Sequence, residues 1–284
     1  TKALEREDLF TVVLDIFSTD TSDYADYVLP ASSFLEFDDL VSGYFNLSFS
    51  AQTKAAEIIK GAMPNQDIFR LLSKAMGFSE MQLYESDEEI IDTVLEAVGI
   101  EGGFDSLKKK GTVFPNSQTQ IQFDNFNFPT SSGKIEIASK IAEEDGHPRV
   151  PHPHVDRRPN NSFLRLLTPA SFWLMNSSYG NDPKVLKQLG PSYVIMHPKD
   201  AKKRCLNELD TVRLSNKTGT LVLTLKVSDI VPEGVLMSPK GRWLRTDRKN
   251  KLNVNVLNPG KKSDMGESSS VHGVEVLVSS VTSC

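Results

Sequence analysis

Six short apolar runs dominate the second half of this 284-residue chain, and they constrain its fold more than any other feature. Between residues 162 and 280 the runs are FLRLL, YVIM, TVRLS, TLVLTLKV, GVLMS and GVEVLVSS, separated by turn residues such as Asn216–Gly219. Many short strands at regular spacing are typical of closed β-barrels and β-sandwiches. A predicted helix over Pro198–Arg204 interrupts the series, with proline at the first helical position, where its missing N–H is harmless. We therefore predict a barrel or sandwich.

The first part of the chain has a different pattern, which predicts strands and helices in one α/β region. Residues 9–17 (LFTVVLDIF) form one continuous apolar run, as expected of a strand that is buried on both faces. Tyr27–Pro30 (YVLP) predicts a second short strand, which the proline ends.

Two helices are predicted with clear ends. In Asn65–Met76 the apolar residues recur at helical spacing, and Gly77 follows as a stop signal. In Asp87–Val98 the apolar residues form one stripe. Ser86 is the expected N-cap of this helix, and Glu89 is its partner in a capping box.

A segment rich in proline and charge lies between Gly146 and Pro159. Proline removes backbone donors and biases its neighbours toward extended conformations, so this segment predicts a linker. We place the domain boundary there, which gives predicted domains at 1–150 and 151–284.

The histidines predict no metal centre and no catalytic dyad. His147, His152 and His154 could in principle bind a metal, but their proline-rich setting gives no fixed geometry. We interpret them as incidental residues of a linker. His197 and His272 have no Ser or Cys partner at a diagnostic spacing.

Four acidic residues, Asp15, Asp20, Asp23 and Asp26, lie in and after the first predicted strand. Their spacing does not match an EF-hand, so a solvated loop is the preferred interpretation over a cation site. Asp15 has a further interpretation, because a carboxylate at the end of a buried parallel strand lies where α/β sheets bind nucleotides. It could accept hydrogen bonds from a guanine edge or from ribose hydroxyls, although no glycine-rich phosphate loop accompanies it.

Composition and charge exclude several classes of protein. No apolar run approaches the roughly 20 residues that span a bilayer. Two cysteines, Cys205 and Cys284, exclude a disulfide framework and a cysteine-based metal site within this chain. The net charge is −5, yet residues 197–262 carry fifteen Lys and Arg against six Asp and Glu. This basic stretch indicates either an anionic ligand or a solvated face, and we predict no nucleic-acid partner.

Two polar loops are the strongest candidates for a binding site. One lies at Thr168–Asn181 and contains Thr, Ser and Asn together with Trp173 and Tyr179. The other lies at 253–266 (NVNVLNPGKKSDMG). Such side chains and exposed backbone amides match the hydrogen-bonding pattern of a flat heterocyclic ligand. The alternative for the first loop is an ordinary β-loop with an Asx turn.

Several motifs follow one another in a set order along the chain. Residues 9–36 contain a strand ending in Asp, then Thr-x-Thr, Ala-Asp-x-x-Leu-Pro-Ala and a Glu. SGKIEI at 132–137, LLTPAS with NSSYGN, HPKDA at 197–201, DTVRL and NVNVLNP come after them. These motifs, in this order, resemble those of the molybdopterin oxidoreductases of the dimethyl-sulfoxide-reductase family. The last portion resembles the molybdopterin-dinucleotide-binding domain. The resemblance implies an α/β, partial Rossmann-like segment followed by a six-stranded double-psi β-barrel.

The resemblance also implies a role for particular residues in binding a molybdenum or tungsten bis(pterin guanine dinucleotide) cofactor. Asp15 and Thr19 would contact the guanine end of one molybdopterin guanine dinucleotide, and Asn255 and the loop to Gly266 would close over the second pterin. The residues that would line the pterin and phosphate path are Thr168, Ser171, Asn176, Ser177 and Ser178. The basic residues that could neutralise pyrophosphate, or simply be solvated, are Arg242, Arg245, Arg248 and Lys249.

The family's iron–sulfur cysteines and its metal ligand have no counterpart in this sequence. We therefore expect this chain to be the C-terminal part of a larger enzyme, with the 4Fe–4S cluster in the missing N-terminal part. Its expected partners are the rest of the parent enzyme or a catalytic subunit, and electron-transfer subunits. The isolated chain is expected to be inactive. The alternatives are a non-catalytic double-psi barrel used as a scaffold or assembly subunit, and a nucleotide-binding regulatory protein.

The sequence departs from the family's pattern after HPKDA. The family has two glycines there, which flank a loop that needs positive φ, and this chain has Cys205 and Leu209 instead. A residue other than glycine in that conformation costs roughly 1 kcal/mol or more. We therefore expect the shape of this turn to differ from that of the family.

Overall fold

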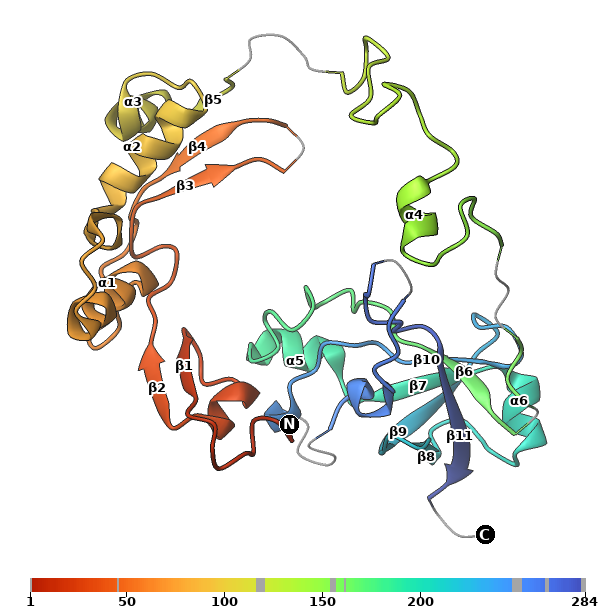
Figure 1. Ribbon diagram of the computed structural model, residues 1–284. Coiled ribbons are helices and arrows are strands. Elements are labelled where there is room, and N and C mark those ends of the chain that lie inside the picture. Colours follow the sequence, from red (N-terminus) through yellow and green to blue (C-terminus); the bar gives the residue numbers. More distant parts are fainter. Residues whose placement is uncertain are drawn as a thin grey trace. The chain divides into compact units, whose positions relative to one another are not determined.

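The computed structural model describes residues 2–44, 46–115, 121–153, 157–160, 162–246, 252–263 and 266–281. The chain forms two compact units, Thr1–Phe128 and Pro129–Cys284 (Figure 1). The predicted domains divide the chain later, at residue 150, and that boundary stays a prediction. The residues singled out above that lie outside the described ranges are His154, Arg248, Lys249 and Cys284.

Strands β1 (Val12–Asp15) and β2 (Tyr27–Pro30) form a parallel pair and confirm both strands predicted in the α/β region. In their register, Val12 lies opposite Tyr27 and Asp15 lies opposite Pro30. A 3-10 helix, η1 (Asp20–Tyr24), connects the two strands.

The expectation that the first strand is buried on both faces is wrong. Val12 is 41% exposed, and the neighbouring Phe10 and Tyr27 are 68% and 62% exposed. The reason is that this sheet has two strands within the described residues, so that each strand is an edge. The rings of Phe10 and Tyr27 pack against each other, with centroids 5.8 Å apart. A continuous apolar run therefore indicates that both faces of a strand could be buried, but it does not show whether other elements pack against those faces.

A second, antiparallel sheet in the same unit consists of β3 (Asp39–Ser42), β4 (Phe49–Gln52) and β5 (Thr112–Val113). Helices α2 and α3 pack beside it (Figure 1). The small core between them contains the buried residues Ile91, Leu95, Phe104 and Leu107.

The two predicted helices are confirmed as α1 (Asn65–Met76) and α2 (Asp87–Ala97). Gly77 ends α1 with a φ of 73°, which suits glycine because it has no Cβ. Ser86 and Glu89 form the predicted capping box: the Glu89 N–H donates to Ser86 Oγ (3.2 Å), and the Ser86 N–H donates to the Glu89 carboxylate (2.7 Å).

The remaining helices are short. The α-helices are α3 (Gly103–Lys110), α4 (Lys140–Glu144), α5 (Pro183–Leu189) and α6 (Pro198–Lys203). The 3-10 helices are η2 (Met81–Tyr84), η3 (Leu244–Thr246) and η4 (Val254–Leu257). Helix α6 confirms the helix predicted over Pro198–Arg204. No helix in the described part of the chain is long and apolar enough to cross a membrane.

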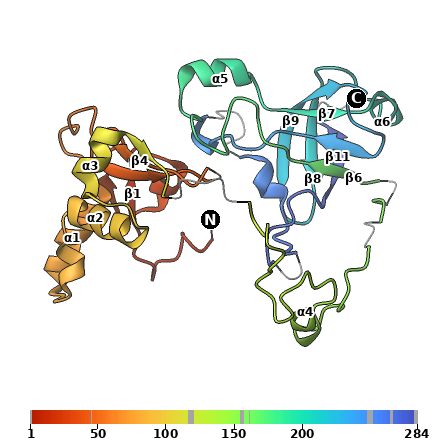
Figure 2. The ribbon, with the colours of Figure 1, turned by 90° about the horizontal axis from the view of Figure 1, so that it is seen from above.

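The second unit is built around a closed six-stranded barrel (Figure 2). Its strands are β6 (Leu164–Leu167), β7 (Tyr193–Met196), β8 (Thr211–Ser215), β9 (Thr220–Val227), β10 (Val235–Met237) and β11 (Val274–Ser280). Around the barrel the order is β10-β6-β11-β8-β9-β7, with β6–β10 and β7–β9 parallel and the other pairs antiparallel. All six predicted runs form its strands, and the predicted six-stranded barrel is confirmed.

The barrel interior is filled by the side chains of alternate residues along each strand. In β9, Leu221, Leu223 and Leu225 are buried while the residues between them are not. This period of two is expected where one face of a strand points into a core. The other strands contribute the fully buried Leu166, Val194, Met196, Val212, Leu214, Leu236 and Val276.

The turn after α6 keeps positive φ without glycine. Cys205 has a φ of 53° and Leu209 a φ of 67°. The Leu209 N–H donates to the Leu225 carbonyl (2.9 Å), which ties this turn to the barrel wall. Both non-glycine residues therefore adopt the left-handed conformation themselves and carry its strain.

Replacing Cys205 or Leu209 with glycine is expected to stabilise the chain. Each change relieves the strain of the left-handed conformation in the folded chain, but glycine also raises the conformational entropy of the unfolded chain. The net result is a gain of about 0.5 kcal/mol in the free energy of unfolding. Urea unfolding followed by circular dichroism measures this gain. Lys217→Gly is the control, because Lys217 lies in an exposed turn without positive φ and should lose stability. A loss of stability in Cys205→Gly and Leu209→Gly would show that the turn is not strained.

Candidate cofactor-binding site

A cavity of about 480 Å³ lies at one end of the barrel. This is the end where β6 and β10 finish and where β7 and β9 begin. The floor is apolar and contains Leu221, Leu223 and Met237. The loop that follows β6 provides one wall through residues 169–174, and residues 252–254 provide another. Its volume falls within the roughly 300–1,000 Å³ typical of small-molecule sites.

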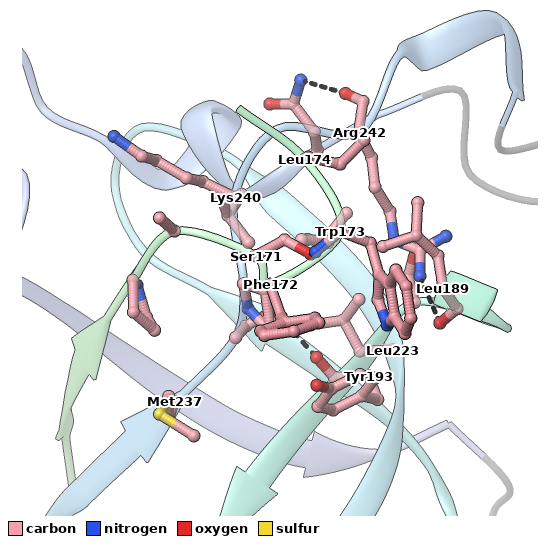
Figure 3. Close-up of a pocket in the computed structure, with 18 of the residues that line it drawn as sticks. Ser171, Phe172, Trp173, Leu174, Leu189, Tyr193, Leu223, Met237, Lys240 and Arg242 are labelled. Atoms are coloured by element: carbon pink, nitrogen blue, oxygen red, sulfur yellow. Dashed lines mark hydrogen bonds between the residues drawn. The ribbon is translucent and has the colours of Figure 1, made fainter. Parts of the chain in front are cut away.

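Three aromatic rings lie around this cavity (Figure 3). Phe172 and Trp173 are consecutive on the loop and form an edge-to-face pair, with centroids 5.0 Å apart and an interplanar angle of 84°. Phe172 is 91% exposed, although aromatic side chains of this size are usually buried in large part. Below them Tyr193 carries the ammonium group of Lys226 over its ring, 3.6 Å from the centroid. Exposed rings of this kind can stack on a flat heterocycle.

The charge around the cavity is positive. Lys226, Lys240 and Arg242 are among its lining residues, and no Asp or Glu is among the described ones. Arg242 is engaged within the protein, because its guanidinium donates to the carbonyls of Leu189 (2.9 Å) and Pro191 (3.3 Å). The Lys240 backbone N–H donates to the Pro169 carbonyl (3.0 Å), and the side chain extends away from the aromatic rings.

Of the predicted residues on the first polar loop, Ser171 lines the cavity. Its Oγ accepts a hydrogen bond from the Trp173 N–H (3.2 Å), which bends the loop and directs the indole. Thr168 lies just before the lining residues and is only 7% exposed. Its N–H donates to Nδ1 of His272 (3.4 Å), and its hydroxyl donates to the Val271 carbonyl (3.4 Å). Thr168 therefore ties the start of the loop to the segment before β11.

Asn176, Ser177 and Ser178 are exposed and do not line the cavity. They form a tight turn further along the same loop, in which the Ser178 N–H donates to the Met175 carbonyl (3.0 Å). Asn176 has a φ of 56°. The three residues thus present backbone and side-chain polar groups next to the cavity wall rather than inside it.

On the second polar loop, Asn255 is exposed and also lies beside the cavity rather than in its lining. Its N–H donates to Oδ1 of Asn253 (3.0 Å). Asn253 and Val254 do line the cavity, so the two polar loops reach the same space through their neighbouring residues. Gly266 is exposed, and the two residues before it lie outside the described ranges.

Asp15 and Thr19 belong to the other unit. Asp15 ends strand β1, as predicted, and its carboxylate accepts a hydrogen bond from the Phe17 N–H (3.1 Å). Thr19 precedes η1, and its carbonyl accepts from the Ser22 N–H (3.0 Å) and hydroxyl (2.6 Å). Both side chains are half-buried.

Phe172, Trp173 and Asn253 lie within the two predicted loops but are not among the individual residues predicted to bind, and Lys240 lies outside both loops. A signal exists for two of them, because consecutive large aromatic residues in a polar loop are unusual unless they contact something. The place of Lys240 follows from barrel closure, which brings the segment after β10 to the loop after β6 and leaves no local pattern in the sequence.

The chain is similar to several known proteins. Residues 164–275 match the family described as "Molydopterin dinucleotide binding domain". The chain is 35% identical over 280 residues to "Probable oxidoreductase YoaE" of Bacillus subtilis, covering 93% of this chain and 39% of that protein. It is 28% identical over 275 residues to "Dimethyl sulfoxide/trimethylamine N-oxide reductase" of Rhodobacter capsulatus, covering 85% of this chain and 33% of that protein.

The fold itself is shared with a solved structure. Acetylene hydratase from Pelobacter acetylenicus superposes with a TM-score of 0.82 over 98% of this chain and 41% of its own, at 20% sequence identity. The chain thus spans about two fifths, or less, of the length of these proteins. Residues 164–275 therefore match a molybdopterin-dinucleotide-binding domain, and the chain is similar over most of its length to part of the molybdopterin oxidoreductases of the dimethyl-sulfoxide-reductase family.

Proposed function

We propose that this chain is the cofactor-binding portion of a molybdenum or tungsten oxidoreductase, and that it binds and orients molybdopterin guanine dinucleotide. The observation that carries the proposal is the cavity at the barrel end, which combines exposed aromatic rings, basic side chains and two polar loops. A pterin is flat and rich in hydrogen-bonding groups, and a dinucleotide is anionic. Both properties complement this lining.

The roles of individual residues follow from their positions. Phe172 and Trp173, whose planes are nearly perpendicular, contact a ring of the cofactor, one by its face and the other by its edge. Ser171 and Asn253 hydrogen-bond to the edge of the cofactor, and Lys240 binds phosphate. The predicted residues that extend this surface along the two loops are Thr168, Asn176, Ser177, Ser178, Asn255 and Gly266. Asp15 and Thr19, in the other unit, are proposed for the guanine end of one dinucleotide.

When bound, the cofactor supplies electron transfer and oxygen-atom chemistry through its metal. The residues of this chain bind and orient it, and no proton transfer or nucleophilic step is assigned to them. The metal ligand, the 4Fe–4S cluster and the contacts to electron-transfer subunits are proposed to lie in the remainder of the enzyme. The isolated chain is accordingly expected to show no turnover.

Analysis of the purified full-length protein tests this proposal. Elemental analysis should find molybdenum or tungsten bound to the protein. Acid release should yield guanine nucleotide together with a pterin that fluoresces after oxidation, with more than one nucleotide per metal ion. A folded full-length protein that is isolated without pterin after expression in a host that makes the cofactor would instead favour a scaffold role.

A further inference from the structure

The segment Gly241–Trp243, which follows strand β10, approaches the polar loop after β6 unusually closely. A Cβ atom on Gly241 would lie 2.0 Å from the Asn176 carbonyl oxygen, and Gly241 has a φ of 103°. A Cβ atom on Gly180 would lie 2.5 Å from Cδ1 of Trp243. Both positions therefore need glycine so that the segment and the loop can touch.

Trp243 makes a directional contact at this point. Its indole Nε1–H donates to the Ser177 carbonyl with a distance of 2.6 Å. Trp243 is half-buried, with its ring against the backbone at Gly180. Among the described residues, it is the one side chain outside the loop that hydrogen-bonds to the turn at 175–180.

The segment is held firmly from its other side. The guanidinium of Arg242 donates to the carbonyls of Leu189 and Pro191, at the end of α5. The Asn253 side-chain amide donates to the Arg242 carbonyl (3.1 Å). Asn253 belongs to the second polar loop and lines the cavity. The segment Gly241–Trp243 therefore contacts both polar loops.

The turn on the polar loop needs such support. Asn176 and Tyr179 have φ angles of 56° and 65°, although neither is glycine. Non-glycine residues in this conformation are strained, and the strain persists only where surrounding contacts fix it. The loop's own hydrogen bonds are local, so the contact from Trp243 supplies the restraint from outside.

We propose that Trp243 is a positioning residue for the cofactor. Its indole N–H fixes the Ser177 carbonyl and so holds the polar turn of the first loop in the shape that faces the ligand. The inference rests on the proposed function of the cavity, and it assigns to Trp243 a role through the loop rather than through contact with the cofactor.

The test compares three forms of the full-length protein: the natural one, Trp243→Phe and Trp243→His. Phenylalanine keeps a ring but removes the donor, and histidine restores a ring N–H at a similar reach. Hydrogen exchange read by mass spectrometry should be about fivefold faster at 175–181 in Trp243→Phe, the factor expected for one lost neutral hydrogen bond. Exchange in β9 should not change. The content of pterin and guanine nucleotide should fall at least threefold, and Trp243→His should recover most of both effects.

Ile230→Ala is the control, because Ile230 is 71% exposed in the turn after β9 and should leave both readouts unchanged. Unchanged exchange at 175–181 in Trp243→Phe would overturn the inference. Equally fast exchange throughout β9 would also overturn it, since Trp243 would then act on overall stability. Faster exchange at 175–181 in Trp243→Phe together with full cofactor content would overturn the inference as well. If the natural protein contains no pterin nucleotide, the proposed function fails, while the exchange data still report on the turn.

Discussion

Reversing the charge of Lys240 is expected to lower the cofactor content of the full-length enzyme ten- to hundredfold. Lys240 lies at the rim of the cavity, and its side chain forms no ion pair with a described carboxylate. Of the three basic lining residues it is the one most available to a ligand, because Lys226 lies over Tyr193 and Arg242 is bonded to two carbonyls. A charge-assisted hydrogen bond contributes about 1.5–3 kcal/mol. Lys240→Glu removes it and adds repulsion toward phosphate.

The measurement is the amount of guanine nucleotide and pterin released per protein, with the thermal midpoint taken alongside it. Lys217→Glu makes the same change of charge at an exposed turn between β8 and β9 and is expected to keep full cofactor content. Equal loss in both variants would indicate that only net charge matters. Full cofactor content in Lys240→Glu would remove Lys240 from the proposed site.

Replacing Asp200 with alanine is expected to lower the free energy of unfolding by about 3 kcal/mol, the largest stability effect anticipated here. Asp200 lies on α6 and is only 4% exposed. Its Oδ2 accepts from the Gly234 N–H (2.7 Å), and its Oδ1 lies 3.4 Å from the guanidinium of Arg204. Alanine would leave the Gly234 N–H without its acceptor in a mostly buried place. The Arg204 guanidinium would keep the Asp200 main-chain carbonyl (3.1 Å) but lose the carboxylate.

Two variants separate the parts of this effect. Asp200→Asn keeps an oxygen for the Gly234 N–H but removes the charge, so it should lose less stability, about 1 kcal/mol. Lys199→Ala removes an exposed ion pair to Glu233 from the same helix and should cost less than about 1 kcal/mol. Denaturant unfolding measures all three. If Asp200→Ala is no more harmful than Lys199→Ala, then Asp200 does not join α6 to the start of β10.

Local signals in the sequence predict much of this fold. The six barrel strands are short alternating runs between turns, and α1 and α2 have clear stop and capping residues. Helix α3 is missed because its buried side is limited to Phe104 and Leu107, too few for a period of 3.6 to be recognised. Helix α5 carries a start signal, Asp182 followed by Pro183, but it comes directly after a loop whose polarity suggested a ligand.

The candidate site is less predictable, for a physical reason. Its walls come from residues 169–174, 237–242 and 252–254, which barrel closure brings together across up to 85 positions of sequence (from 169 to 254). A periodic pattern in the sequence predicts which residues of one strand share a face. It does not predict which loop from a distant part of the chain packs near them. Polarity therefore identified the right loops, while the aromatic and basic lining of the cavity follows only from the closed barrel.

Hydrogen exchange of the full-length protein with and without its cofactor tests the central claim most directly. The cofactor-free form can be obtained by expression in a host that cannot make the pterin. Binding at the barrel cavity predicts slower exchange in the loaded protein at 169–181 and 252–258, with little change in β8. Equal exchange of both loops in the loaded and cofactor-free forms would contradict the claim that this cavity holds the pterin nucleotide.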